Sequence, residues 1–462
     1  MRRLFAEGAF SQAFVPILAE YKNTRTPEET RALVDHITML MGITLIIVTA
    51  IGIVSAPLII YLSAPGFSAD TEKFDLTVAL LRITFPYILF ISLVALAGSI
   101  LNTYGKFNVP AITPALLNIS FIACALWLTP VFEPPILALA WAVFIGGILQ
   151  LAFQIPFLLH LKLLPRIRLR NPDTGAGRVI KLMGPAIFGV SVSQISMRIN
   201  TIFASLLVTG SVSWLYYADR LMEFPAGLLG VALGTILLPS LAKHYNSNST
   251  EEYSHLLDWG LRMTIMLTLP AALALALLAI PLITTLFHHG AFTDHDAWMT
   301  REALIAYSIG LPGIILVKVL APGFYARQNI RTPVKIAIIT LLATQLMNLA
   351  FIIPFQHAGL ALAIGLGACI NAGLLYYQLR SHDIYQPQPG WLIFFLKIIV
   401  AVTVMGIVLW FATGSSASWL LDSAMTRAGR LSLIILAGAS SYFAALWLLG
   451  FRLHDFTKQQ AI

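Results

Sequence analysis

Long, nearly uninterrupted apolar runs dominate the sequence and limit it to one class of fold. A helix needs about 20 mostly apolar residues to cross a bilayer. The sequence contains twelve such runs, near 36–63, 77–103, 110–130, 135–160, 180–208, 213–242, 262–287, 301–325, 333–354, 357–379, 390–413 and 429–450. A transmembrane β-barrel would instead show alternating segments of roughly 10 residues. The sequence therefore predicts an all-α polytopic membrane protein.

Composition excludes several other classes of protein. Hydrophobic residues make up 58% of the chain and charged residues only 11%, whereas soluble domains carry about 25% charged residues. A soluble enzyme and a nucleic-acid-binding module are therefore excluded, although the net charge is +8. Both cysteines, Cys124 and Cys369, lie within apolar runs. This position argues against a disulfide framework and against a cysteine-based zinc site.

The loop charges predict an orientation in the membrane. When loops are assigned alternately to the two sides, one side carries eighteen lysines and arginines and the other carries four. The positive-inside rule places the more basic side in the cytoplasm. It predicts a cytoplasmic connector at 162–181, a periplasmic loop at 288–300 and a cytoplasmic C-terminus.

An internal repeat predicts two lobes. At an offset of 223 residues, the segment after Pro16 matches the segment after Pro239, Pro110 matches Pro333, and Leu137-Ala-Leu-Ala matches Leu360-Ala-Leu-Ala. The second copy holds six predicted helices, and an even number makes the two copies parallel, as in some transporters. We expect an N-lobe over 1–160, a basic connector over 161–179, a C-lobe over 180–380 and two extra helices in 381–462. By the same offset the first copy lacks a helix and a half, roughly 40–55 residues.

A polar cluster interrupts the run at 213–242. Tyr216, Asp219, Arg220 and Glu223 are three or four residues apart and therefore share one helical face. A charge at the centre of a span costs about 2.5–3.5 kcal/mol, so such residues usually face water or one another. We favour a polar site that faces a cavity. The alternative is that Glu223 or Asp219 neutralises Arg220 only to hold helices together.

Other charged residues have simpler explanations. Arg3, Glu7 and Ser11 form a stripe near the N-terminus that suits either a site or a helix end. Arg262 and Lys318 lie near span ends or aromatic residues, so we expect their charged groups to reach the membrane surface. The histidines and aspartates of 288–300 lack the helical spacing of a zinc site, and we expect a solvated loop. With no motif for catalysis, metal or phosphate cofactors, we predict neither an enzyme nor a cofactor.

Four segments resemble one transporter family over essentially the whole chain. They are LFAEGAFSQAFVPILAEY, GPAIFGVSVSQISMRINTIFASLL, YYADRLMEFPAGLLGVALGTILLPSLAKHY and VLAPGFYARQNIRTPVKIA. They are similar to the MurJ (MviN) lipid II flippases of the multidrug/oligosaccharidyl-lipid/polysaccharide exporter superfamily. The resemblance implies two six-helix lobes, two further helices that hold a polyprenyl tail, and a cationic central cavity. Arg2, Arg3 and Arg220 resemble the family's cavity arginines, and Glu7 resembles the acid of its N-terminal motif.

The resemblance also implies a function. The chain is expected to move lipid II, the lipid-linked peptidoglycan precursor, from the cytoplasmic to the periplasmic leaflet of the bacterial inner membrane by alternating access. Arginine suits the pyrophosphate headgroup because its guanidinium group donates two parallel hydrogen bonds. A coupling ion or the membrane potential, worth about 2.3 kcal/mol per charge per 100 mV, would drive the return of the empty carrier.

Two other functions remain open at this point, and a third is disfavoured. The chain could be a drug or polysaccharide exporter of the same superfamily, or a non-transporting scaffold of a cell-wall complex. A membrane-embedded glycosyltransferase is disfavoured because the loops are too short for a catalytic domain. Expected partners are lipid II and membrane lipids, and no nucleic acid.

Overall fold

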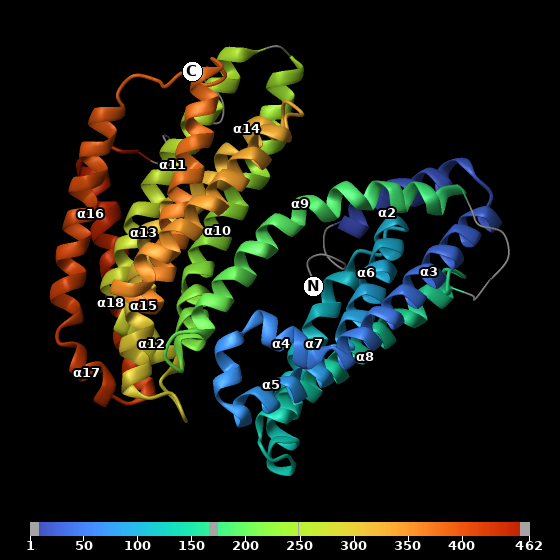
Figure 1. Cartoon of the computed structure of the whole chain (residues 1–462). Helices are drawn as coiled ribbons and strands as arrows, with labels where there is room; N and C mark the ends of the chain where they lie inside the picture. The colour runs from blue at the N-terminus through green and yellow to red at the C-terminus, as the bar shows by residue number, and fades with distance from the viewer. Residues whose placement is uncertain (1–8, 166–173, 248, 453–462) are drawn as a thin grey trace. The chain divides into compact units, whose positions relative to one another are not determined.

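The structure, a computed structural model, describes residues 9–165, 174–247 and 249–452, and these residues form helices without any strand. Ten of these helices are long and apolar enough to cross a membrane. One of them, α15 (Arg331–Ser381), covers two predicted spans. A further helix, α9 (Thr174–Ser205), covers the predicted span at 180–208. All twelve predicted spans thus fall on helices, and the prediction of an all-α polytopic membrane protein is confirmed (Figure 1).

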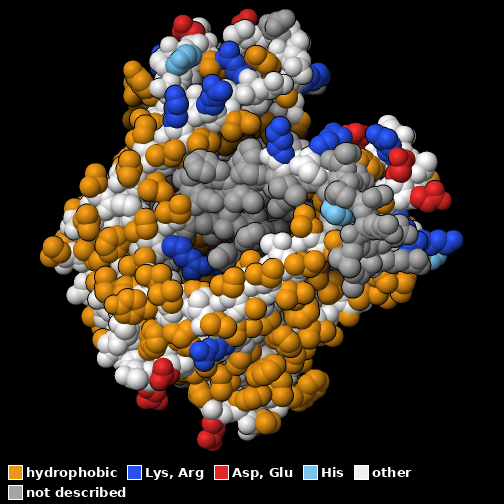
Figure 2. Space-filling view, turned by 45° about the vertical axis from the view of Figure 1, so that its right-hand side comes forward, with side chains coloured by type: hydrophobic (Ala, Val, Ile, Leu, Met, Phe, Trp, Pro, Cys, Tyr) orange, Lys and Arg blue, Asp and Glu red, His pale blue; other side chains and the backbone are white. Residues whose placement is uncertain are grey.

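The outer faces of many helices are apolar, as a lipid environment requires. Large hydrophobic side chains such as Ile47, Ile353 and Leu433 are 53%, 84% and 69% exposed. Hydrophobic side chains cover much of the face shown in Figure 2, whereas acidic side chains lie toward its edges. A bilayer solvates such apolar surface, whereas an exposed patch of this extent on a soluble protein would drive aggregation.

The chain divides into two compact units, residues 1–202 and 203–462. The helices of unit 1 are α2 (Ala9–Thr24), α3 (Pro27–Val54), α4 (Ala56–Ser63), α5 (Thr71–Thr84), α6 (Tyr87–Thr103), α7 (Asn108–Trp127) and α8 (Ile136–His160), followed by most of α9. Short 3-10 helices cover Pro65–Ala69 and Thr129–Val131. The predicted span at 36–63 is interrupted at Ser55, between α3 and α4.

Buried polar side chains join α6, α7 and α8. The amide nitrogen of Gln150 donates to the carbonyl oxygen of Thr113 at 3.2 Å, and that of Gln154 donates to the Thr113 hydroxyl at 2.9 Å. The hydroxyl of Tyr87 donates to Gln150 Oε1 at 3.3 Å. These groups would be costly in hydrocarbon without partners, so the network stabilises a single arrangement of the three helices.

Unit 2 contains α10 (Ser211–Asn246), α11 (Thr250–Leu277), α12 (Ala279–Phe287), α13 (Asp294–Leu320), α14 (Pro322–Tyr325) and α15 (Arg331–Ser381), then α16 (Trp391–Thr413), α17 (Ser416–Leu421) and α18 (Ala424–Leu448). Two predicted spans, 333–354 and 357–379, are joined within α15 across a kink at Gln356, where φ is 49°. The predicted span at 262–287 is divided between α11 and α12 at Leu278.

The backbones of α13 and α15 meet directly. A Cβ atom built on Gly310 would overlap Cα of Gly365, and one built on Gly313 would lie 2.6 Å from the backbone nitrogen of Cys369. Small residues of this kind let membrane helices approach closely and gain van der Waals contact. The inner faces of these helices belong to the main hydrophobic core of unit 2.

Asp258 of α11 fastens the segment that leads to the last helices. Its Oδ1 accepts hydrogen bonds from the Tyr385 hydroxyl at 2.6 Å, from Trp391 Nε1 at 2.8 Å and from the Gln388 backbone at 3.1 Å. Its Oδ2 accepts from Arg262 Nε at 2.7 Å. Burial, and secondarily the Asp258 carboxylate, raises the pKa of the Tyr385 hydroxyl, which therefore remains a donor.

This arrangement corrects the expectation for Arg262. Its guanidinium group pairs with the buried Asp258 carboxylate and lies 4.9 Å from the ring centre of Trp391. The group also donates to the carbonyl oxygen of Pro389 at 3.0 Å. Arg262 thus links α11 to α16 because an acid one turn away offers a partner within the protein.

We expect Gly310→Ala to destabilise unit 2 by about 1–3 kcal/mol, the usual cost of overpacking a core. The added methyl group would force α13 and α15 apart because it meets backbone atoms, which cannot rotate away. Gly373→Ala is the matched control, since no heavy atom lies within 4 Å of its Cβ position on α15. Thermal unfolding of both variants in detergent provides the measurement. Equal melting temperatures for the two would contradict the close approach.

We expect Asp258→Asn to destabilise the protein by about 3 kcal/mol or more, because Arg262 would lose its charged partner in a buried site. The control is Glu251→Gln on the same helix, whose side chain is 90% exposed, with an expected change within about 0.5 kcal/mol. Tryptophan fluorescence during thermal unfolding reports both the melting temperature and the surroundings of Trp391. An unchanged melting temperature for Asp258→Asn would show that this cluster does not fasten α16.

Candidate functional site

The predicted polar cluster lies on α10, which remains helical through Pro225 and Pro239. The helix starts after Gly210, whose φ of 107° belongs to the left-handed region. Its first turn is held by Trp214, whose indole nitrogen donates to Asp296 Oδ1 of α13 at 2.7 Å. Ala218 and Leu221 are buried in the core, so the opposite face of α10 is turned outward.

That outward face carries Tyr216, Arg220 and Glu223 on successive turns, as the spacing predicts. Arg220 Nη1 lies 2.6 Å from Glu223 Oε2, and their side chains are 53% and 50% exposed. The guanidinium carbon of Arg220 lies 4.9 Å from the centre of the Tyr216 ring. Arg220 is therefore held between an acid and an aromatic face while remaining accessible.

The exposure of this ion pair decides what it can do. Exposed ion pairs contribute only about 0–1 kcal/mol. An incoming phosphate can therefore replace Glu223 at small cost. Arg220 offers such an anion a planar, permanently charged donor that binds two oxygens at once. The cluster thus has the chemistry of an anion site that closes on itself when empty.

The other predicted site residues are Asp219, Arg2, Arg3 and Glu7. Asp219 is half-buried, at the edge of the exposed face rather than on it. Arg2, Arg3 and Glu7 lie outside the described residues. The structure therefore brings together Tyr216, Arg220 and Glu223, with Asp219 beside them.

Lys318 of α13 is a cation near this site that the sequence reasoning assigned to the membrane surface. It is half-buried, and its Nζ donates to the carbonyl oxygen of Ala226 on α10 at 2.9 Å. A Cβ atom on Gly230 would overlap the Lys318 side chain, so this glycine makes room for it. The four-residue spacing of Gly230 and Gly234 is typical of helices that pack closely, but it does not identify the lysine.

The 288–300 region is not a simple solvated loop. His288 Nε2 lies 2.8 Å from Asp294 Oδ1, and its Nδ1 lies 3.1 Å from Nη1 of the buried Arg427 on α18. The same Arg427 nitrogen donates to the carbonyl oxygen of Thr284 at 2.7 Å. Across the part of the chain that the structure describes, no three metal-binding side chains gather. This cluster packs α12 against α18.

Comparisons with known proteins identify relatives over nearly the whole chain. A family described as lipid II flippase MurJ matches residues 1–428. The lipid II flippase MurJ of Burkholderia cenocepacia is 49% identical over 99% of this chain and 90% of its own length. The probable lipid II flippase MurJ of Haemophilus influenzae is 43% identical over 98% of this chain and 91% of its own length.

Solved structures agree with these relatives. A lipid II flippase MurJ in an inward closed conformation matches with a TM-score of 0.80 and 28% identity, over 97% of this chain and 89% of that one. A multidrug resistance transporter of the MATE family matches with a TM-score of 0.63 and 16% identity, over 83% of this chain and 95% of that one. The second likeness concerns the fold alone.

Proposed function

The chain belongs to the lipid II flippase MurJ family, and from this premise we propose that it moves lipid II from the cytoplasmic to the periplasmic leaflet of the bacterial inner membrane. Lipid II is the molecule named in its relatives' descriptions. The observation that carries the proposal within this chain is the accessible Arg220 on the membrane-spanning helix α10, held by an ion pair that an anion can replace. This function requires binding and release of a headgroup, and no covalent chemistry.

We assign Arg220 the role of binding the diphosphate of lipid II. In the empty protein Glu223 holds the guanidinium group, and Tyr216 supports it from one side. When the diphosphate arrives, its oxygens replace the carboxylate, and Glu223 turns toward water. Asp219 keeps the face polar, and we propose Arg2, Arg3 and Glu7, on the basis of their motif alone, as further residues that bind the substrate.

Transport then follows the general scheme of alternating access. Binding of the dianionic diphosphate makes the site more negative, and release on the far side reverses this change. The membrane potential, worth about 2.3 kcal/mol per charge per 100 mV, acts on this difference in charge and would drive the return of the empty carrier. A coupling ion would serve the same purpose.

We expect Arg220→Ala to abolish lipid II export, because no other group on this face can donate a charged bidentate pair. Arg220→Lys should retain part of the activity, since it keeps the charge and loses the planar fork. The measurement is growth and lipid II export in bacteria depleted of their own flippase, at matched membrane levels of each variant. Lys243→Gln, which removes an exposed charge from the same helix, is the control and should support normal growth.

Three outcomes would contradict the proposed role of Arg220. Full complementation by Arg220→Ala would leave it as a structural pair with Glu223. Equal loss in Arg220→Ala and Lys243→Gln would indicate a general effect of charge on insertion. Growth support by Arg220→Ala without lipid II export would favour a scaffold.

We further propose that the C-terminus and the 162–181 connector face the cytoplasm, because the loops on that side carry most of the lysines and arginines. Single cysteines in the connector and in the 288–300 loop, in a chain lacking Cys124 and Cys369, test this orientation. In intact spheroplasts an impermeant thiol reagent should label the 288–300 loop alone. Labelling of the connector instead would invert the orientation.

A further inference from the structure

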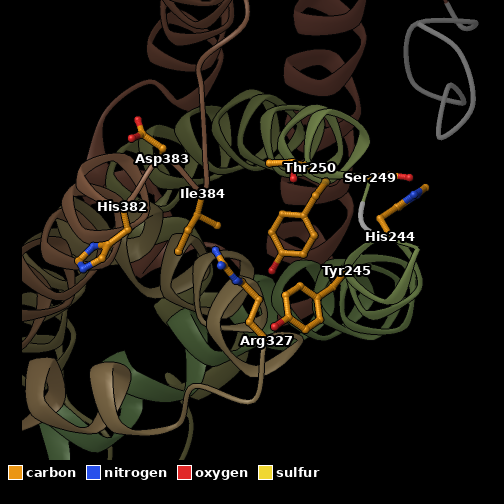
Figure 3. A pocket seen from close by; sticks show the side chains of 9 residues that line it. His244, Tyr245, Ser249, Thr250, Arg327, His382, Asp383 and Ile384 are labelled. Carbon is orange, nitrogen blue, oxygen red and sulfur yellow. The ribbon is translucent and has the colours of Figure 1, made fainter.

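A cavity of about 250 Å³ lies at one end of unit 2, where α10 and α15 end and α11 begins (Figure 3). Its lining comes from these three helix ends and from the turn after α14, and includes Tyr245, Tyr253, Arg327 and His382. The cavity is separate from the Arg220 site. Tyr245 lies 25 residues beyond Arg220 on the same helix, which corresponds to roughly 37 Å along the axis.

Arg327 is the central cation of this cavity. Its guanidinium carbon lies 5.5 Å from the centre of the Tyr245 ring, and among the ion pairs of the described residues none includes Arg327. The nearby acids are engaged or directed elsewhere. Glu252 pairs with His244 at 2.7 Å, and the carboxylate of Asp383 points away from Arg327 (Figure 3).

The backbone around Arg327 is fixed before any ligand arrives. The hydroxyl of Tyr253 donates to the carbonyl oxygen of Gly323 at 2.5 Å, which ties α11 to α14. The Arg327 backbone nitrogen donates to Phe324 at 3.1 Å, and Asn329 Oδ1 accepts from the Thr332 backbone nitrogen at 3.2 Å. A site whose donors are already positioned loses little entropy on binding.

The remaining lining supplies hydrogen-bond donors for an anion. Ser249 is the N-cap of α11, and its hydroxyl does not accept from that helix's first turn, so backbone N–H groups there are available. The hydroxyl of Thr250 and the ring of His382 also line the cavity. His382 Nδ1 lies 2.9 Å from the carbonyl oxygen of Gln378 and donates to it, so the other nitrogen of the neutral ring is an acceptor and is not one of the donors.

The cavity is small, at about 250 Å³, and it is partly open to solvent. Pockets for drug-sized ligands start at about 300 Å³. A phosphate group with a small substituent fits this range, and the guanidinium group matches phosphate oxygens in geometry and charge.

We propose that this cavity binds a phosphate group, with Arg327 as its principal donor, independently of the transport site on α10. The phosphate belongs either to the headgroup of an anionic lipid at the membrane surface or to a soluble ion. The two sources share the same recognition chemistry, and the location at the ends of membrane-spanning helices lets a lipid headgroup reach it.

The experiment uses the whole chain, purified in detergent and carrying Arg220→Ala, so that phosphate bound on α10 does not contribute. Binding of inorganic phosphate and of short-chain phosphatidylglycerol is measured by calorimetry. We expect Arg327→Gln to weaken binding of at least one probe tenfold or more, because hydrogen bonds to charged groups contribute about 1.5–3 kcal/mol. Arg327→Lys should have an intermediate affinity. Arg331→Gln, an exposed charge four residues away, should change affinity less than twofold.

The outcomes distinguish the sources and the alternatives. Binding of phosphatidylglycerol alone identifies a lipid headgroup site, and binding of both probes identifies a general phosphate site. Failure of both probes to bind would overturn the proposal. So would equal weakening by Arg327→Gln and Arg331→Gln, since it would indicate unspecific attraction to a basic surface. If Arg327→Gln lowers the melting temperature, the affinities of Arg327→Lys and Arg331→Gln decide the question. The proposal then requires that Arg327→Lys binds more weakly than Arg331→Gln. The result does not depend on whether the chain transports lipid II.

Discussion

Hydrocarbon offers no hydrogen-bonding partner to a polypeptide, so each backbone group within the bilayer must be satisfied inside the protein. The same requirement extends to polar side chains within the spans. The amide nitrogens of Gln150 and Gln154 meet it through Thr113 in unit 1, and Lys318 meets it through a backbone carbonyl of α10. Polar residues in these helices therefore define specific helix contacts where apolar residues alone would permit sliding.

Asp258 and Arg427 extend this principle to the ends of the spans. Asp258 collects donors from the segment between α15 and α16, and Arg427 joins α18 to the end of α12. Both are buried, so the loss of either charge would leave partners without compensation. The last two long helices, α16 and α18, are thus joined to the rest of unit 2 by a few charged groups in addition to their apolar contacts.

Arg220 differs from these residues because its partner is easily replaced. The ion pair with Glu223 is half exposed. It therefore orients the Arg220 side chain in the empty protein and leaves it able to bind another anion. The difference between a structural charge and the binding charge that we propose lies here in burial. Asp258 is 3% exposed and holds four donors, whereas Arg220 retains the freedom to exchange one acid for another anion. Arg327, at one end of unit 2, resembles Arg220, but its neighbour is the aromatic ring of Tyr245 and not an acid.

The sequence by itself determined the features that depend on local spacing. Run lengths predicted twelve helical spans, and the positions of Tyr216, Arg220 and Glu223 predicted their common face, because both follow from the geometry of a single helix. The tertiary structure alone decided which distant residues meet. It paired Asp258 with Tyr385 and Trp391, seated Lys318 against Ala226, brought Gly310 onto Gly365, and gathered three helix ends around Arg327. These contacts join residues far apart in the chain, and no period or motif encodes them, since they arise only when whole helices pack.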